Sequence, residues 1–171
     1  VLVNNAAAFP GALTVDQEVT SFERTLDVNI RGLYFLTAGV ADGMVRRGYG
    51  SIVNISAMVA TKGVAAASIY SATKAAVESL TRTWAVEFGR FGVRVNAVAP
   101  GPTRTEGVAA ERGEVNEELG RALPLGRTGR PEEIAQAVAK RADGGGSRGL
   151  GCREGSGEPT GGLGKSEGTR Q

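Results

Sequence analysis

Residues 51–88 read SIVNISAMVATKGVAAASIYSATKAAVESLTRTWAVEF, and this stretch decides the fold. It opens with a β-branched run, residues 51–56, that is typical of a buried strand. A loop of small residues follows, and then apolar residues recur at helical spacing: Val77, Leu80, Trp84 and Phe88. This spacing predicts a helix that begins near residue 69 or 70 and ends at Gly89 or Gly92.

The rest of the chain continues the alternation of strands and helices. Apolar runs at residues 1–3 and 93–99 predict two further strands, and the spacing of apolar residues from 22 to 40 predicts a helix between the first two strands. Pro131, followed by two glutamates, predicts a last helix that runs to about Lys140. This order predicts an α/β fold, a partial doubly wound, Rossmann-like parallel sheet in three layers. Ligands of such sheets bind at the carboxyl ends of the strands.

Composition excludes several classes of function. The net charge is +2 and basic residues are interleaved with acidic ones, so we expect no nucleic-acid partner. The chain has no histidine and a single cysteine, Cys152, which argues against a metal site and against Ser-His-Asp hydrolysis. No apolar run approaches the roughly 18 residues of a membrane span, and no signal segment is recognisable. We therefore expect a cytoplasmic protein without a membrane partner.

The chain divides by composition into two parts. Residues 1–140 are predicted to form the folded domain, whereas residues 141–171 hold eleven of the 26 glycines. Such a segment buries too little apolar surface to offset its ordering entropy, which predicts a disordered tail. The abrupt change near residue 140 suggests a shift of reading frame in the coding DNA. A first residue, Val1, that already lies inside an apolar run suggests a fragment.

Tyr70 and Lys74 are the candidate catalytic pair. On a helix, residues four apart leave the same face about one turn apart. A cation held near a phenol favours the phenolate, which lowers the tyrosine pKa and makes the phenol a usable general acid and base. The same pair is also common on solvated helix faces, so the surrounding residues must decide between the two interpretations.

Six pieces of the chain occur in the order and at the spacings of the classical short-chain dehydrogenase/reductase family, which the chain resembles over residues 1 to about 139. The pieces are residues 4–7, 27–30, 52–56, 70–74, 96–101 and 124–134. The resemblance implies an NAD(P)-binding domain and hydride transfer between NAD or NADP and a small-molecule alcohol or carbonyl. Tyr70 would be the general acid and base, and the intact protein would be a homo-oligomer, a dimer or a tetramer.

The resemblance also implies roles for single residues. Lys74 would lower the Tyr70 pKa and hold the nicotinamide ribose, and Asn29 would anchor a water in the proton relay. Residues 103–126 would form a substrate lid, and Trp84 with Phe88 fits either the core or a helix pairing between subunits. The cofactor would be held by residues at the rim formed by the carboxyl ends of the strands: Asn4, Ala6, Tyr70, Lys74, Pro100, Gly101, Thr103 and Thr105.

The chain departs from the family pattern where the serine that polarises the substrate oxygen is expected, because that position is Ala57. Ser56 is the first candidate to replace it, although neighbouring strand residues face opposite sides. Ser68 and Thr61 are weaker substitutes. The glycine-rich pyrophosphate loop of the family would lie upstream of Val1. Two alternatives therefore stay open: a catalytically inactive cofactor-binding or scaffolding homologue, and a non-functional truncated fragment.

Overall fold

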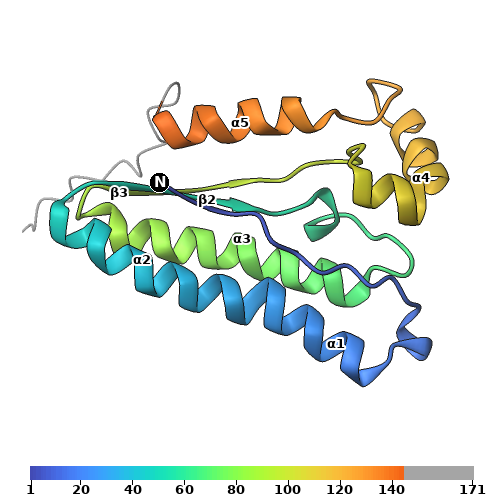
Figure 1. Cartoon of the computed structure of the whole chain (residues 1–171), viewed down its shortest axis with the longest axis horizontal. Coiled ribbons are helices and arrows are strands. Elements are labelled where there is room, and N and C mark those ends of the chain that lie inside the picture. Colours follow the sequence, from blue (N-terminus) through green and yellow to red (C-terminus); the bar gives the residue numbers. More distant parts are fainter. Residues whose placement is uncertain (145–171) are drawn as a thin grey trace, which may run out of the picture.

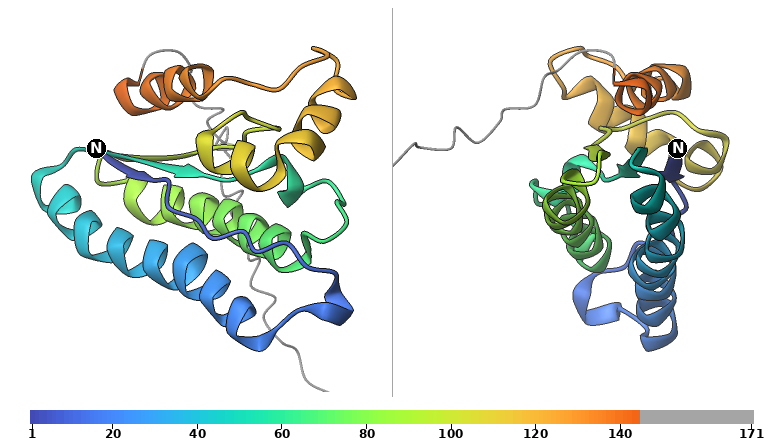
Figure 2. Two further views of the ribbon diagram at one scale, coloured as in Figure 1. Left: turned by 45° about the vertical axis from the view of Figure 1, so that its right-hand side comes forward. Right: turned by 90° about the vertical axis from the view of Figure 1, so that its left-hand side faces the viewer.

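The computed structural model describes residues 1–144, apart from the side chains of residues 109–112, and these residues form three layers (Figure 1). A parallel sheet occupies the middle layer, with strand order β1-β2-β3. The strands are β1 (Leu2–Asn4), β2 (Gly50–Ile55) and β3 (Val93–Val98). Helices α2 and α3 cover one face of the sheet and α5 covers the other (Figure 2). The predicted α/β class, the three strands and the three layers are confirmed.

The helices differ from the predictions mainly in their bounds. The helix predicted between the first two strands consists of α1 (Val19–Leu26), a π turn η2 (Asp27–Gly32) and α2 (Leu33–Arg47). The central helix α3 runs over Ser68–Gly89 and therefore begins slightly earlier than predicted. Single 3₁₀ turns occur at η1 (Thr14–Asp16) and η3 (Met58–Ala60). Among residues 1–144, no helix is long and apolar enough to cross a membrane.

The polar composition of residues 103–127 predicts a loop with one short helix, but in the structure the longer helix α4 (Glu106–Arg121) occupies most of this segment. Thr105 caps its amino end, because the hydroxyl accepts a hydrogen bond from the Val108 amide at 3.3 Å. This polar composition is thus compatible with a helix in which most of the described side chains are exposed.

Helix α5 (Pro131–Asp143) passes the predicted end at Lys140 by three residues. Its carboxyl end is held by β3, since the Arg94 guanidinium donates to the carbonyl oxygens of Arg141, at 2.7 Å, and Ala142. A guanidinium at this end offsets the negative pole of the helix dipole. Gly144 ends the helix in the left-handed conformation, with a φ of 78°. The predicted tail is described only as far as this residue, and residues 145–171 lie outside the described part.

A ladder of buried polar side chains connects the sheet to α2 and α3. The amide nitrogen of Asn4 donates to Asn54 Oδ1 at 2.8 Å and to Thr37 Oγ1 at 2.9 Å. Asn54 Nδ2 in turn donates to Thr81 Oγ1 at 2.8 Å, and Asn54 is fully buried. Because buried polar groups are costly unless paired, this ladder fixes the register of β1 on β2 and the seat of both helices.

We expect Asn54→Ala to lower the free energy of unfolding by about 1–3 kcal/mol, because it leaves a buried donor and a buried hydroxyl short of partners. Chemical denaturation followed by circular dichroism measures the change. The matched control is Asn5→Ala, since Asn5 is exposed, and it should stay within about 0.5 kcal/mol of the wild type. Equal effects of the two substitutions would contradict a structural role of the ladder.

Candidate active site

The loops that follow the three strands meet at one edge of the sheet, because parallel strands all end on the same side (Figure 1). Backbone hydrogen bonds join these loops. The Ser56 amide donates to the Val98 carbonyl at 2.8 Å, and the Met58 amide donates to the Pro100 carbonyl at 2.9 Å. The predicted site residues after β2 and β3 are therefore brought together.

Tyr70 and Lys74 lie in the first two turns of α3 at this edge. Lys74 is only 3% exposed, and its ammonium donates to the Ile55 carbonyl at the end of β2 at 2.7 Å. The same nitrogen lies 5.4 Å from the centre of the Tyr70 ring. The two side chains thus share one face of α3, as their spacing predicts. The Tyr70 hydroxyl takes part in none of the hydrogen bonds found within residues 1–144 and is not buried away from solvent.

Burial dominates the acid–base properties of the pair. Desolvation raises the pKa of Tyr70 and lowers the pKa of Lys74 to about 8. The expected lowering of the Tyr70 pKa by Lys74 is therefore not found in this structure. The physical reason is that the ammonium makes its hydrogen bond to the Ile55 carbonyl, while the phenol ring lies in partly apolar surroundings.

Asn29 is placed beside this pair by the π turn. Its Oδ1 accepts from the Ala8 amide at 2.7 Å, and its Nδ2 donates to the Ala8 carbonyl at 3.0 Å. The same Nδ2 donates to Thr73 Oγ1 at 3.1 Å, and Thr73 donates to the Tyr70 carbonyl at 2.8 Å. Asn29 therefore joins the loop after β1 to the turn of α3 that carries Tyr70, and its role in holding a water stays a prediction.

Ser56 does not lie where a replacement for the missing serine should. Its hydroxyl donates to Glu78 Oε1 at 2.8 Å and also contacts the Lys74 carbonyl at 3.3 Å. These partners lie one and two turns beyond Tyr70 on α3, because the strand directs Ser56 toward the helix and away from the edge. The prediction that Ser56 polarises the substrate oxygen is therefore not supported by the geometry. Of the weaker substitutes, Thr61 donates to the Met58 carbonyl at 3.3 Å, and Ser68 is exposed at the start of α3.

The predicted cofactor residues outside α3 follow either β1 or β3. At the end of β1, Asn4 is buried in the polar ladder and steadies the strand, whereas Ala6 is exposed just after it. Pro100 and Gly101 follow β3, and a side chain at Gly101 would meet Leu123 at 3.5 Å and Met58 at 3.7 Å. Two more residues continue the same rim: Thr103, whose hydroxyl donates to the Gly101 carbonyl at 3.0 Å, and Thr105 at the start of α4.

Comparisons with known proteins decide the family. A family model described as enoyl-(acyl carrier protein) reductase matches residues 1–142. The 3-oxoacyl-[acyl-carrier-protein] reductase of Thermotoga maritima is 38% identical over 138 residues, which cover 81% of this chain and 56% of that protein. This chain belongs to the short-chain dehydrogenase/reductase family. The resemblance seen in the sequence is thereby confirmed.

Solved structures of the family agree with the fold. A short chain dehydrogenase/reductase family protein is 57% identical with a TM-score of 0.78, covering 82% of this chain and 58% of its own. A gluconate 5-dehydrogenase from Burkholderia cenocepacia, in complex with NADP and tartrate, is 31% identical with a TM-score of 0.78, covering 82% and 56%. The chain thus spans little more than half the length of these dehydrogenases and reductases.

Three residues of the site were missed by reasoning from the sequence. Phe9 stacks on Tyr70, Thr73 links Asn29 to the Tyr70 backbone, and Glu78 binds Ser56. The sequence offered a signal for Thr73, because it lies between Tyr70 and Lys74. In the structure it faces the buried Asn29. Phe9 lies five residues after the end of β1, and the proline and glycine that follow it are typical of a loop, which carries no signal for a ring stack.

Lys74 predicts a pH dependence of the stability of this chain. Its folded pKa of about 8 lies below the ordinary value of 10.5, so the unfolded chain binds more protons between these values. The free energy of unfolding should therefore rise with pH over this window, and the penalty of the buried ammonium is fully present below pH 8.

The measurement compares urea unfolding of the wild type and of Lys74→Met at about pH 7 and about pH 9.5, below the range where Tyr70 titrates. The wild type should gain stability relative to Lys74→Met. The control Lys62→Met removes an exposed lysine and should follow the wild type. Parallel pH profiles of the wild type and Lys74→Met would be the contrary result.

Proposed function

We propose that this chain carries the proton-transfer half of an NAD(P)-dependent oxidoreductase that interconverts an alcohol and a carbonyl, with Tyr70 as general acid and base. The observation that carries the proposal is the free hydroxyl of Tyr70 at the carboxyl edge of the sheet, with the Lys74 ammonium behind its ring. The relatives support it, since those named above are a reductase that acts on 3-oxoacyl groups and a gluconate dehydrogenase with bound NADP.

The residues at the edge fit a nicotinamide cofactor. An ammonium has three donors, and within the described residues Lys74 uses one of them, on Ile55. The other donors remain for hydroxyl groups such as those of a ribose. Ala6 and Gly101, exposed after β1 and β3, leave room for close approach of a ring. The bound cofactor supplies or accepts the hydride, and everything else falls to the protein.

Proton transfer is the part assigned to this chain. In reduction Tyr70 would give its hydroxyl proton to the oxygen that forms on the substrate, and in oxidation it would take that proton back. Lys74 would orient the ribose and, by its charge, stabilise the phenolate that remains after reduction. Asn29 and Thr73 hold the turn of α3 on which Tyr70 stands, so the hydroxyl keeps its place at the edge.

Tyr70→Phe should lower turnover at least a hundredfold, the usual range for loss of a general acid. The assay follows oxidation of NADH and NADPH with a panel of carbonyl compounds. Because the chain spans 56% of the Thermotoga reductase, it is tested joined to the amino-terminal part of that protein. Tyr49→Phe, at an exposed tyrosine on the opposite edge, is the control and should keep full activity. Undiminished turnover in Tyr70→Phe would refute the role.

A catalytically inactive homologue is the second candidate, and Ala57 is the observation that favours it. The family position of the serine that polarises the substrate oxygen is Ala57, which has no hydroxyl, and the neighbouring Ser56 hydroxyl is bound to Glu78. Cofactor binding without turnover in the joined protein would support this candidate. A 171-residue chain that neither folds nor binds cofactor would support the remaining one, a non-functional fragment.

Ala57→Ser separates the first two candidates, because it restores a donor where negative charge develops. In an active enzyme it should raise turnover roughly tenfold or more, since a single such donor is worth two to three orders of magnitude elsewhere. Ala60→Ser, in the adjacent η3 turn, is the matched control and should change nothing. An increase that disappears when Tyr70→Phe is added would tie both residues to one reaction, whereas no increase would favour the inactive homologue.

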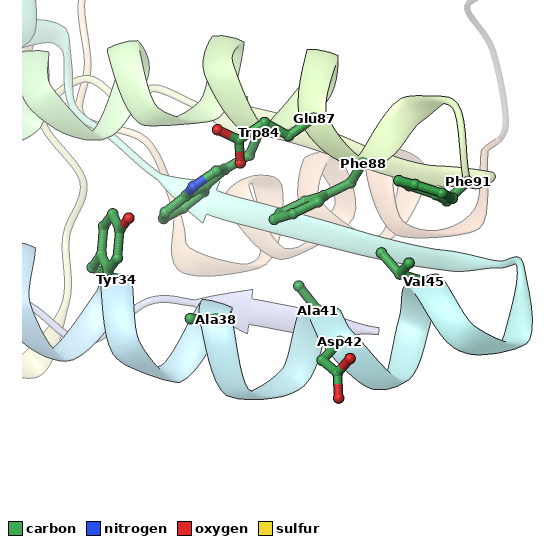
Figure 3. A pocket seen from close by; sticks show the side chains of 9 residues that line it. All are labelled: Tyr34, Ala38, Ala41, Asp42, Val45, Trp84, Glu87, Phe88 and Phe91. Atoms are coloured by element: carbon green, nitrogen blue, oxygen red, sulfur yellow. The ribbon is translucent and has the colours of Figure 1, made fainter.

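Subunit pairing is the remaining part of the proposal. A groove of about 380 Å³ runs between α2 and α3 (Figure 3). The groove is lined by aromatic side chains: Tyr34 from α2, Trp84 and Phe88 from α3, and Phe91 from the turn that follows α3. Of these, Trp84 is part of the buried core. Apart from Asp42 and Glu87 the lining is apolar, and such a helix pair fits an interface between two copies, as expected for a homo-oligomer.

A further inference from the structure

The segment after β1 is held at two points across the start of α3. Asn29 binds both backbone groups of Ala8, at 2.7 and 3.0 Å. Four residues later the Ala12 amide donates to the Ala66 carbonyl at 3.1 Å, in the loop that leads into α3. Ala66 has a φ of 60°, which is a strained conformation for a residue with a side chain. The residues between the two anchors, 9–11, therefore run past the amino-terminal end of α3 (Figure 2).

Phe9 is the side chain that this segment presents to the site. Its ring stacks on Tyr70 with the ring centres 4.3 Å apart and the planes 25° apart. The same amide of Asn29 that fixes Ala8 also binds Thr73, whose hydroxyl holds the Tyr70 carbonyl. The buried Asn29 side chain thus fixes the position of the backbone beside both rings. The stack of Phe9 on Tyr70 is therefore held in place by hydrogen bonds of the fold.

We propose that Phe9 is a positioning residue for Tyr70, whose ring it holds against the edge of the sheet and covers on one face with apolar surface. The proposal rests on the proposed function in so far as Tyr70 is taken to transfer the proton. Phe9 itself carries no group that could exchange a proton, so any effect on the reaction is exerted through the Tyr70 ring.

The stack has a chemical consequence. An apolar cover disfavours the phenolate, and burial raises the pKa of Tyr70. Lys74, on the same helix, is the charged side chain found beside the ring among residues 1–144, and its ammonium does not offset the effect of burial on the Tyr70 pKa. Phe9 keeps the phenol protonated and so favours the state that donates to a carbonyl oxygen.

A direct titration tests this without any turnover. The chain has three tyrosines, so Tyr34→Phe combined with Tyr49→Phe leaves Tyr70 as the sole phenol. Ultraviolet absorbance of the phenolate then gives the titration midpoint in the 171-residue chain. Adding Phe9→Ala should move the midpoint to lower pH, because the apolar cover is lost. A native circular dichroism spectrum with an unchanged midpoint would overturn the proposal.

Two further variants make the result independent of folding defects. Phe9→Leu keeps apolar cover but removes the stack, so its midpoint should stay nearer that of the parent than does the midpoint of Phe9→Ala. Phe35→Ala is the matched control, since Phe35 is 67% exposed and contacts Tyr34 instead of Tyr70. It should leave the midpoint in place, and a shift as large as that of Phe9→Ala would count against the proposal.

Kinetics of the joined protein provide the second readout. Loss of the stack in Phe9→Leu should lower kcat roughly threefold to tenfold with less change in KM, as expected from the strength of an aromatic pair. Wild-type kcat in Phe9→Leu would overturn the positioning role. If the midpoint moves in Phe9→Ala while no variant turns over any substrate, the stack stands and the proposed dehydrogenase function fails.

Discussion

The amide of Asn29 joins three segments that are distant in the sequence, and the geometry of the site depends on it. Its oxygen and both of its N–H groups are bound, to the two backbone groups of Ala8 and to the Thr73 hydroxyl. At 2% exposure an unpaired amide would cost a large part of the stability of a small domain, so these partners are strongly enforced. The loop after β1 and the first turn of α3 are consequently placed relative to each other within hydrogen-bond tolerances.

Polar groups replace apolar packing in much of the layer beneath the sheet. The ladder from Asn4 through Asn54 to Thr81 and the buried ammonium of Lys74 occupy positions that aliphatic side chains could fill. Directional bonds fix register and orientation more strictly than non-directional packing does. Desolvation of Lys74 is the cost of this arrangement, and its lowered pKa of about 8 is the visible sign of it. The fold thus gives up some stability to place a charge behind Tyr70.

Much of the fold follows from local patterns. Runs of β-branched residues mark β2 and β3, and the apolar stripe of α3 with its pair Tyr70 and Lys74 follows from helical spacing. What could not be predicted depends on contacts between distant segments. Strand alternation indicated that Ser56 faces away from the edge, but only the structure reveals its partner Glu78. The stack of Phe9 on Tyr70 arises where two distant segments of the chain meet. Helix α5 continues past Lys140 because Arg94, on strand β3, binds its carboxyl end.

The π turn at Asp27–Gly32 lies within an otherwise continuous helix from Val19 to Arg47. Such a turn is geometrically equivalent to one residue inserted into an α-helix. Each residue of a regular helix is rotated by about 100° about the helix axis relative to the one before it. Removing the extra residue would therefore turn Asn29 away from Ala8 and Thr73, unless the whole preceding part of the helix rotated as well. The π turn therefore rotates the helix before it relative to the helix after it. As a result α2 packs its apolar stripe on the sheet while the π turn directs the Asn29 amide to the site. A regular helix, shorter by one residue, would lose the junction between the two loops.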